Sequence, residues 1–395
     1  MKVPITKPYF GEEEKKAVCD VLDSGWLVQG PKVTEFERMV CEYTGAKFAR
    51  AATSCTTALH LALLALGIGP GDEVLLPSLT YIASANAIEY TGAKPVFVDI
   101  DLETFNIAPK KVEQYLERGK KQRSKVKGIM PVHLFGLVAG MKPIMDLATE
   151  YDLRVIEDAA CALGSLCDSR YAGTFGDAGC FSFHPRKPIT VGEGGMLITN
   201  NPEIASRVQS LRDHGAAVSD LARHGKGGFL LPAFEMLGYN YRMSDIHGAI
   251  GVEQMKKFPW IVARRIEKAK RYDEALKDVE WLQTPCVPEG YKHTYQSYVT
   301  LVRKPKFEQL TLDAIQDLNQ FRNKVMAKLE DEGIATRQGT HAVHTLNYYK
   351  RKYDIKYGDY LNSFAADKLS MTLPLYPQMT DEEQEYVIQH IKGLR

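Results

Sequence analysis

Residues 127–158 read KGIMPVHLFGLVAGMKPIMDLATEYDLRVIED, and the fold class follows from the pattern of this stretch. It contains two short, nearly continuous apolar runs, Lys127–His133 and Leu153–Asp158, on either side of the helical pattern Met141–Glu150. Such runs are typical of strands that are covered on both faces. A strand, a helix and a second strand in this order predict part of a parallel sheet with helices packed against it.

The same alternation continues on both sides of this stretch. Further strands are predicted at Glu73–Pro77, Lys94–Asp99 and Gly179–Phe183, and further helices at Thr56–Leu66 and Ile82–Tyr90. Repeated strand–helix–strand units predict an α/β fold with a mostly parallel sheet and helices on both of its faces.

The pattern changes after about residue 245. The elements predicted there are a helix over Asp245–Lys257 that Pro259 interrupts, a charged helix over Ile261–Lys277, strands near Ser297–Arg303 and Gly333–Arg337, and a last helix capped by Thr380 and Glu383. These elements predict a smaller α+β domain. We therefore expect a large domain over residues 1–250 and a small C-terminal domain over residues 251–395.

Composition excludes several classes of function. The 395 residues carry 50 Lys and Arg against 49 Asp and Glu, a net charge of +1 that argues against a general nucleic-acid binder. The longest apolar run, near Ala58–Leu66, is far shorter than the roughly 20 residues of a membrane span. Residues 1–9 lack the apolar core of a signal peptide. We expect a cytoplasmic protein that binds neither membranes nor nucleic acid.

The sequence gives no sign of a disulfide framework or a metal site. The seven cysteines form no C-x-x-C pair, and an odd, scattered set is typical of reduced thiols: Cys19, Cys41, Cys55, Cys161, Cys167, Cys180 and Cys286. His341 and His344 form an H-x-x-H pair, but no nearby residue completes a zinc site. These two histidines are either ordinary loop or core residues or residues near a substrate.

Ligands of open parallel sheets bind at the carboxyl ends of the strands. Asp158 ends one predicted strand, and Lys187 follows another after His184-Pro-Arg. Ser54-Cys55-Thr56 begins a helix, where unpaired N–H groups favour a phosphate. Tyr81 places an aromatic ring shortly after the strand Glu73–Pro77.

Together these groups suggest pyridoxal 5'-phosphate. Its aldehyde needs a lysine amine, and its ring nitrogen needs an acid that keeps it protonated. Opposite charges about 4 Å apart interact by roughly 4 kcal/mol at an effective dielectric near 20, or about three pKa units. Each residue alone has an ordinary interpretation, as a surface lysine, a turn acid or a helix cap. The hypothesis depends on their combination.

Several longer motifs resemble those of the DegT/StrS family of pyridoxal-phosphate-dependent sugar aminotransferases. They cover almost the whole chain: Ser24–Gly30, Ala65–Val74, Val155–Ala160, Gly176–His184, Gly192–Met196, Leu237–Arg242 and Leu373–Pro377. The resemblance implies the aspartate aminotransferase fold (fold type I), with a mixed, mostly parallel sheet in the large domain. It also implies a homodimer with a shared active site.

The resemblance assigns expected roles to individual residues. Lys187 would bind the cofactor covalently and move protons, Asp158 would pair with the ring nitrogen, and Tyr81 would stack on the ring. The phosphate would be held by Ser54, Cys55, Thr56 and Ser182, and by Asn240 of the neighbouring subunit. The sequence departs from the family at two positions: Cys161 stands where glutamine is common near the cofactor's phenolic oxygen, and Cys55 where glycine is common.

The expected function is the amination of a nucleotide-linked keto sugar in amino-sugar, polysaccharide or O-antigen biosynthesis. A 4-keto-6-deoxyhexose is the first candidate, with glutamate as amino donor and pyridoxamine 5'-phosphate as the intermediate cofactor form. We expect Trp26, His133, Arg337 and His341 near the substrate. Two alternatives remain. One is a sugar dehydratase, a class of relative in which histidine replaces the lysine at the position of Lys187. The other is a regulatory protein without turnover.

Overall fold

The computed structural model describes residues 1–118, 124–217, 233–303 and 310–394. Its central element is a seven-stranded sheet. In spatial order the strands are β1 (Phe48–Ala52), β10 (Gly195–Thr199), β9 (Ala178–Ser182), β6 (Arg154–Asp158), β5 (Val126–Ile129), β2 (Glu73–Pro77) and β4 (Lys94–Val98). Neighbours from β9 to β4 pair in parallel, whereas β10 is antiparallel to both β9 and β1. The expected mixed, mostly parallel sheet is confirmed.

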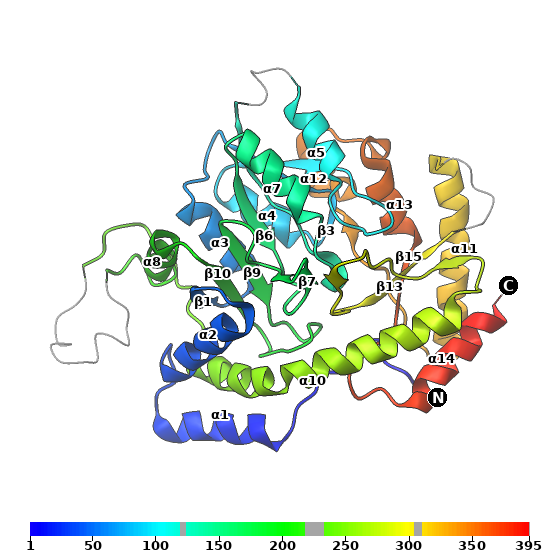
Figure 1. The fold of residues 1–395 in the computed structure, drawn as a ribbon, viewed down its shortest axis with the longest axis horizontal. Helices are drawn as coiled ribbons and strands as arrows, with labels where there is room; N and C mark the ends of the chain where they lie inside the picture. Colours follow the sequence, from blue (N-terminus) through cyan, green and yellow to red (C-terminus); the bar gives the residue numbers. More distant parts are fainter. Residues whose placement is uncertain (119–123, 218–232, 304–309, 395) are drawn as a thin grey trace.

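Helices cover both faces of this sheet (Figure 1). One face packs against α3 (Cys55–Ala65), α4 (Ala83–Tyr90) and α8 (Pro202–Leu211). The other packs against α2 (Pro31–Thr44), α5 (Pro109–Leu116), α7 (Met141–Glu150) and α10 (Asp245–Leu276). Successive strand residues point to opposite faces, so Val155 and Ile156 of β6 belong to different cores. This explains why most strands of the sheet are dominated by apolar residues.

The predicted interruption at Pro259 is wrong, because α10 is one continuous helix. A proline inside a helix costs roughly 3 kcal/mol, since it lacks an N–H and crowds the preceding turn. Phe258, Ile261 and Val262 beside it are all buried in the core, and this burial offsets the cost. Position 250/251 lies within α10, and the division of the chain into two domains there stays a prediction.

A second core forms around a three-stranded antiparallel sheet, in the order β11 (Leu282–Gln283), β13 (Tyr298–Val302) and β15 (Ser370–Leu373). It is packed with α11 (Leu312–Asp331), α13 (Leu361–Leu369) and α14 (Asp381–Gly393). The predicted capping box of α14 is confirmed, because Thr380 Oγ1 accepts from Glu383 N–H at 3.1 Å. The strand predicted at Gly333–Arg337 is not formed; Ile334 and Arg337 make only isolated bridges.

Short elements complete the structure. One small sheet consists of β12 (Tyr291–Lys292), β7 (Leu166–Cys167) and β8 (Arg170–Tyr171). A second small sheet pairs β14 (His341–Ala342) with β3 (Leu79–Thr80). Among the described residues, the remaining helices are α1 (Glu12–Ser24), α12 (Asn347–Tyr353) and the 3-10 turns Leu134–Gly136, Val343–Thr345 and Tyr357–Tyr360.

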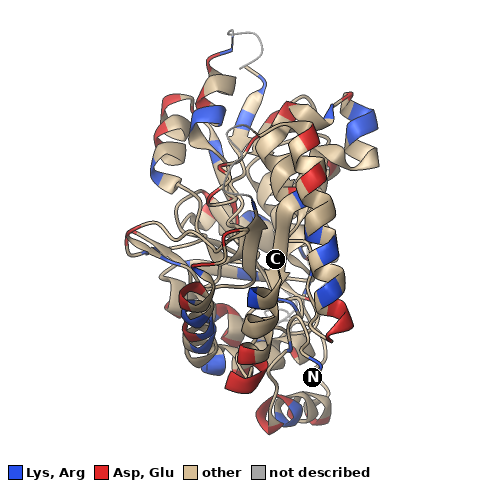
Figure 2. Ribbon diagram, turned by 90° about the vertical axis from the view of Figure 1, so that its right-hand side faces the viewer, with Lys and Arg blue, Asp and Glu red and all other residues tan. Residues whose placement is uncertain are grey.

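Charge is distributed as the composition implies. Figure 2 shows basic and acidic residues interspersed along the helices, which agrees with the net charge of +1. Within the described ranges, no helix combines the length and apolar character needed to cross a membrane.

Candidate active site

Asp158, the last residue of β6, has its carboxylate fixed from two sides. The residue is only 4% exposed. Ser84 Oγ of α4 donates to Asp158 Oδ2 at 2.6 Å, and the N–H of Ala160 donates to Oδ1 at 3.1 Å. Thr80 Oγ1 lies 2.8 Å from Ser84 Oγ and helps to orient that hydroxyl. A carboxylate therefore faces the carboxyl ends of the strands in one defined orientation.

Lys187 lies in the loop between β9 and β10. Its own N–H donates to His184 O at 2.8 Å, which forms a turn. Its Nζ donates to Cys161 Sγ at 3.0 Å, in the turn that follows Asp158. The structure thus brings Lys187 to the end of β6, next to the position where the sequence departs from the family glutamine.

The pKa of the Lys187 amine is raised. Burial by itself would lower it, but the neighbouring Cys161, Cys55 and Asp158 raise it by more. Burial, followed by the charge of Asp158, raises the pKa of the Cys55 thiol well above its usual range. Among the ion pairs of the described residues, none joins Lys187 to Asp158. The hydrogen-bond partner of the amine is instead Cys161 Sγ.

The first turn of α3 supplies backbone N–H groups to the same region. Ser54 is the N-cap residue, and its Oγ accepts from Thr57 N–H at 3.2 Å. Gly195 of β10 packs directly on this turn: a Cβ at that position would lie 2.3 Å from Cys55 N. The glycine allows β10 to pack closely against the first turn of α3, whose N–H groups favour an anion.

The other expected cofactor residues lie on open segments. Tyr81 follows β3 and is 66% exposed. Ser182 ends β9, and its Oγ accepts from His184 N–H at 3.4 Å. Asn240 is exposed and forms a backbone bridge with Asp213.

Three of the four expected substrate residues are partly or fully exposed. His341 lies in β14, directly opposite Thr80 of β3, and Arg337 is exposed beside β15. Burial, followed by the charge of Arg337, lowers the pKa of Arg186. Trp26 is half-buried, and its Nε1 donates to Gln29 O at 3.3 Å.

His133 does not fit the expected substrate role. It is fully buried, its Nε2 lies 2.8 Å from Glu157 Oε2, and its Nδ1 accepts from Ala139 N–H at 3.1 Å. Both ring nitrogens are therefore occupied inside the protein. Glu157 also accepts from three backbone N–H groups, those of Gly173, Phe175 and Gly176. His133 and Glu157 thus hold the loop of residues 173–176 in place. We therefore do not include His133 in the proposed substrate site.

His344, the other member of the H-x-x-H pair, is likewise buried. Its Nδ1 lies 2.6 Å from Ser78 Oγ. Since His341 is exposed and His344 is not, the two imidazoles lie in different environments.

Sequence reasoning missed Ser84 and Arg186. Ser84 contacts Asp158 across 74 positions of sequence, and nothing local distinguishes it from any other helix serine. Arg186 did carry a signal, because it stands directly before Lys187, but only the structure places it near Arg337.

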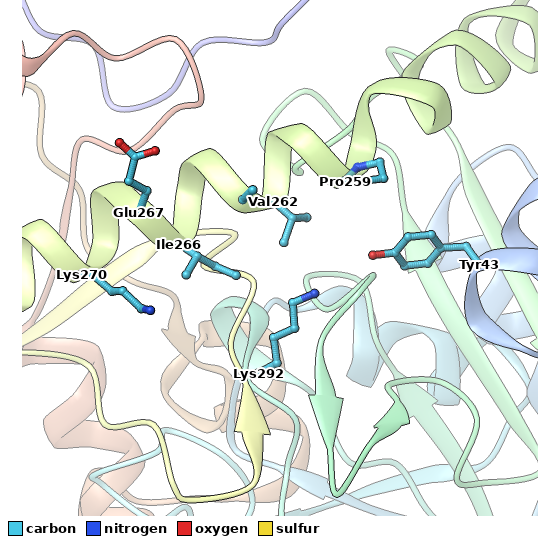
Figure 3. Close-up of a pocket in the computed structure, with 8 residues that line it drawn as sticks. Tyr43, Pro259, Val262, Ile266, Glu267, Lys270 and Lys292 are labelled. Carbon is cyan, nitrogen blue, oxygen red and sulfur yellow. The ribbon is translucent and has the colours of Figure 1, made fainter.

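A separate pocket of about 490 Å³ lies along α10. Figure 3 shows Pro259 and Val262 of α10 on one side of this pocket. The side chains of Tyr43 and Lys292 point toward them from the other side. None of the expected cofactor or substrate residues lines this pocket, so it is not the candidate active site.

The residues at the carboxyl ends of β6 and β9 fit pyridoxal 5'-phosphate. The fit rests on the donor set: an amine, a fixed carboxylate and the N-terminus of α3, against which Gly195 packs. An amine, an acid and an anion seat are the three groups that this cofactor requires.

Comparison with known proteins supports the same conclusion. The spore coat polysaccharide biosynthesis protein SpsC of Bacillus subtilis is 37% identical over 393 residues, which cover 99% of this chain and 97% of SpsC. Spr1654 of Streptococcus pneumoniae in its PMP-form has a TM-score of 0.89 and 29% identity, covering 100% of this chain and 99% of that one; a PLP-form is also known. PseC of Helicobacter pylori, an aminotransferase of pseudoaminic acid biosynthesis, has a TM-score of 0.87 and 25% identity, covering 100% and 99%.

Fold, site and comparisons together define a sugar aminotransferase that depends on pyridoxal 5'-phosphate. The chain belongs to the DegT/DnrJ/EryC1/StrS aminotransferase family, whose model matches residues 8–392. The expected family, fold type and cofactor are thereby confirmed.

Proposed function

We propose that this enzyme transfers the amino group of glutamate to a nucleotide-linked keto sugar, with a 4-keto-6-deoxyhexose as the first candidate. The observation that carries the proposal is the junction of Lys187, Cys161 and Asp158 at the carboxyl ends of β6 and β9. Family membership and the polysaccharide role in the name of SpsC support a sugar substrate.

The proposed chemistry assigns a separate task to each residue. Pyridoxal 5'-phosphate, when bound, supplies an aldehyde that exchanges with amines and a ring that accepts electrons. Lys187 Nζ binds the cofactor and, once released, removes the proton from the α-carbon of the donor. Asp158 keeps the ring nitrogen protonated, and its bonds to Ser84 and Ala160 orient it for this.

Further residues hold the cofactor and the substrates. Ser54, Cys55, Thr56 and Ser182 bind the phosphate, and Tyr81 covers the ring. Arg337, His341 and Trp26 are assigned to substrate binding. A lysine at position 187 favours amino transfer over the dehydratase alternative, in which histidine occupies that position.

We also propose a homodimer in which Asn240 reaches the phosphate of the partner subunit's site. The segment that carries Asn240 also exposes Phe234 and Leu237, which are 61% and 85% exposed in the single chain. Exposed apolar side chains grouped on one segment are typical of an interface. The cytoplasmic location expected from the sequence is kept as part of this proposal.

The test uses ¹⁵N-labelled glutamate with a panel of nucleotide-linked keto sugars. We expect one sugar to gain labelled nitrogen, detected by mass. Borohydride reduction of the cofactor-loaded enzyme should attach the cofactor's mass to the peptide that contains Lys187, and Lys187→Arg should remove both signals. Labelling of a different peptide, or full turnover by Lys187→Arg, would overturn the assignment. Transfer to sugars lacking a nucleotide would correct the substrate class.

A further inference from the structure

Cys161 occupies a turn with a well-defined backbone. Ala162 N–H donates to Ala159 O at 2.8 Å, and Ala159 N–H donates to Cys180 O of β9 at 3.0 Å. The turn is therefore tied to the strand that leads toward Lys187. The half-buried sulfur of Cys161 is held at the end of β6 by these bonds.

The loop that carries Lys187 is equally fixed. Phe183 O accepts from Val191 N–H at 3.0 Å and from Thr190 Oγ1 at 2.7 Å, which closes the loop at its base. The 3.0 Å contact from Lys187 Nζ to Cys161 Sγ thus joins two ordered segments.

The other groups around the amine already have different partners. Asp158 accepts from Ser84 and Ala160, and Cys55 Sγ donates to Cys180 O at 3.5 Å. The sulfur of Cys161 is the group that receives the lysine proton. A thiol in this position differs from the amide common in the family because its sulfur is a larger and weaker hydrogen-bond acceptor.

We propose that Cys161 is a positioning residue for Lys187: its sulfur accepts a hydrogen bond from the amine and holds the amine at the end of β6 whenever the amine is free. The inference rests on the proposed role of Lys187 in amino transfer. The raised pKa of Lys187 agrees with it. The other titratable groups facing the pair are Cys55 of α3, Asp158 of β6 and His184 of the lysine loop.

The first test measures thiol reactivity in the full chain without cofactor. Iodoacetamide labelling of Cys161 at pH 7 is followed by peptide mass, with the exposed Cys19 as an internal reference. Lys187→Met removes the cation and Lys187→Arg retains one. We expect labelling of Cys161 relative to Cys19 to fall roughly tenfold in Lys187→Met, because a neighbouring cation makes a thiol more reactive, and to stay within threefold in Lys187→Arg. Equal rates in wild type and Lys187→Met would overturn the proposal.

The second test changes Cys161 instead of Lys187. It tests the proposal even if Lys187→Met does not fold. Capture of pyridoxal 5'-phosphate, followed by visible absorbance, is measured against pH in Cys161→Ala and Cys161→Ser. Without the sulfur, burial lowers the pKa of the amine, so the midpoint of capture should move to lower pH in both variants. An unchanged midpoint in Cys161→Ala would overturn the proposal. Neither test requires amino transfer, so failure of the ¹⁵N experiment would refute the proposed function separately.

Discussion

Ser84 and Asp158 are joined by a 2.6 Å hydrogen bond between the first turn of α4 and the end of β6. The serine hydroxyl also lies 2.8 Å from Thr80 Oγ1, so a short chain of hydroxyl groups leads from β3 to the carboxylate. Both Ser84 and Asp158 are buried. The charge of Asp158 and its orientation are therefore separate properties that different substitutions can remove.

Asp158→Asn should abolish most activity while leaving the fold intact. The amide keeps the shape of the side chain but loses the charge that stabilises a protonated ring nitrogen. Opposite charges about 4 Å apart interact by roughly 4 kcal/mol at an effective dielectric near 20, which corresponds to about a thousandfold in rate. Steady-state kinetics should show this loss in kcat, and the melting temperature should change little.

Ser84→Ala is the matched control for orientation. It retains the charge of Asp158 and removes one hydrogen bond, and hydrogen bonds to charged groups contribute about 1.5–3 kcal/mol. We expect a loss in kcat of roughly tenfold, much smaller than that of Asp158→Asn. A loss as large as that of Asp158→Asn would mean that orientation, rather than charge, dominates at this residue.

His133→Ala should destabilise the protein without impairing substrate binding. It removes the partner of Glu157 and the acceptor of the Ala139 N–H, and buried groups that lose partners cost about 1–3 kcal/mol each. Chemical denaturation should show a loss of about 2–6 kcal/mol. The KM values for glutamate and sugar should stay within twofold. His341→Ala is the matched control, because its imidazole is exposed; there we expect KM to rise and stability to be unchanged. A raised KM in His133→Ala alone would restore His133 as a substrate residue.

Much of the sheet could be predicted from the sequence because its strands are buried on both faces. β2, β4, β6 and β9 coincide with predicted strands, and β5 overlaps the predicted strand Lys127–His133 but ends at Ile129. β1 and β10 were not predicted. Arg50 interrupts the apolar residues of Phe48–Ala52, and Gly195–Thr199 directly follows a glycine turn. Pro259 gave a strong local signal for a break, but burial of its neighbours outweighed that local preference.

The candidate site was predictable where function follows topology. Asp158 and Lys187 stand after strands, so their meeting at one edge of the sheet follows from chain order. The partner of Lys187 was not predictable from pattern: its contact with Cys161 depends on two turn geometries that periodicity does not encode. His133 also follows a predicted strand and is expected near the substrate, but the structure places its ring nitrogens against Glu157 and Ala139 inside the protein.

Leu237→Arg should convert the proposed dimer to monomers. Leu237 is 85% exposed in the single chain, and a charge there would be buried at an interface. Sedimentation velocity should show half the mass, with activity lost because Asn240 of the partner subunit no longer completes the site. Leu312→Arg is the control, since Leu312 is 41% exposed on α11 of the smaller core. If Leu237→Arg stays dimeric and active, this segment does not form the interface.

The stability of the enzyme should depend on pH through His293. Burial lowers the pKa of His293 to about 3, and its Nδ1 accepts from Tyr295 N–H at 2.8 Å in the neutral form. In the unfolded chain the pKa is about 6.5. Between these values the unfolded state binds one more proton than the folded state, so the free energy of unfolding falls as pH drops below about 6.5, by up to about 1.4 kcal/mol per pH unit from this residue. His293→Gln cannot take up that proton, and denaturation curves from pH 7 to pH 4 should give it a shallower slope by that amount. Parallel slopes for His293→Gln and the wild type would show that the imidazole is protonated in the folded protein.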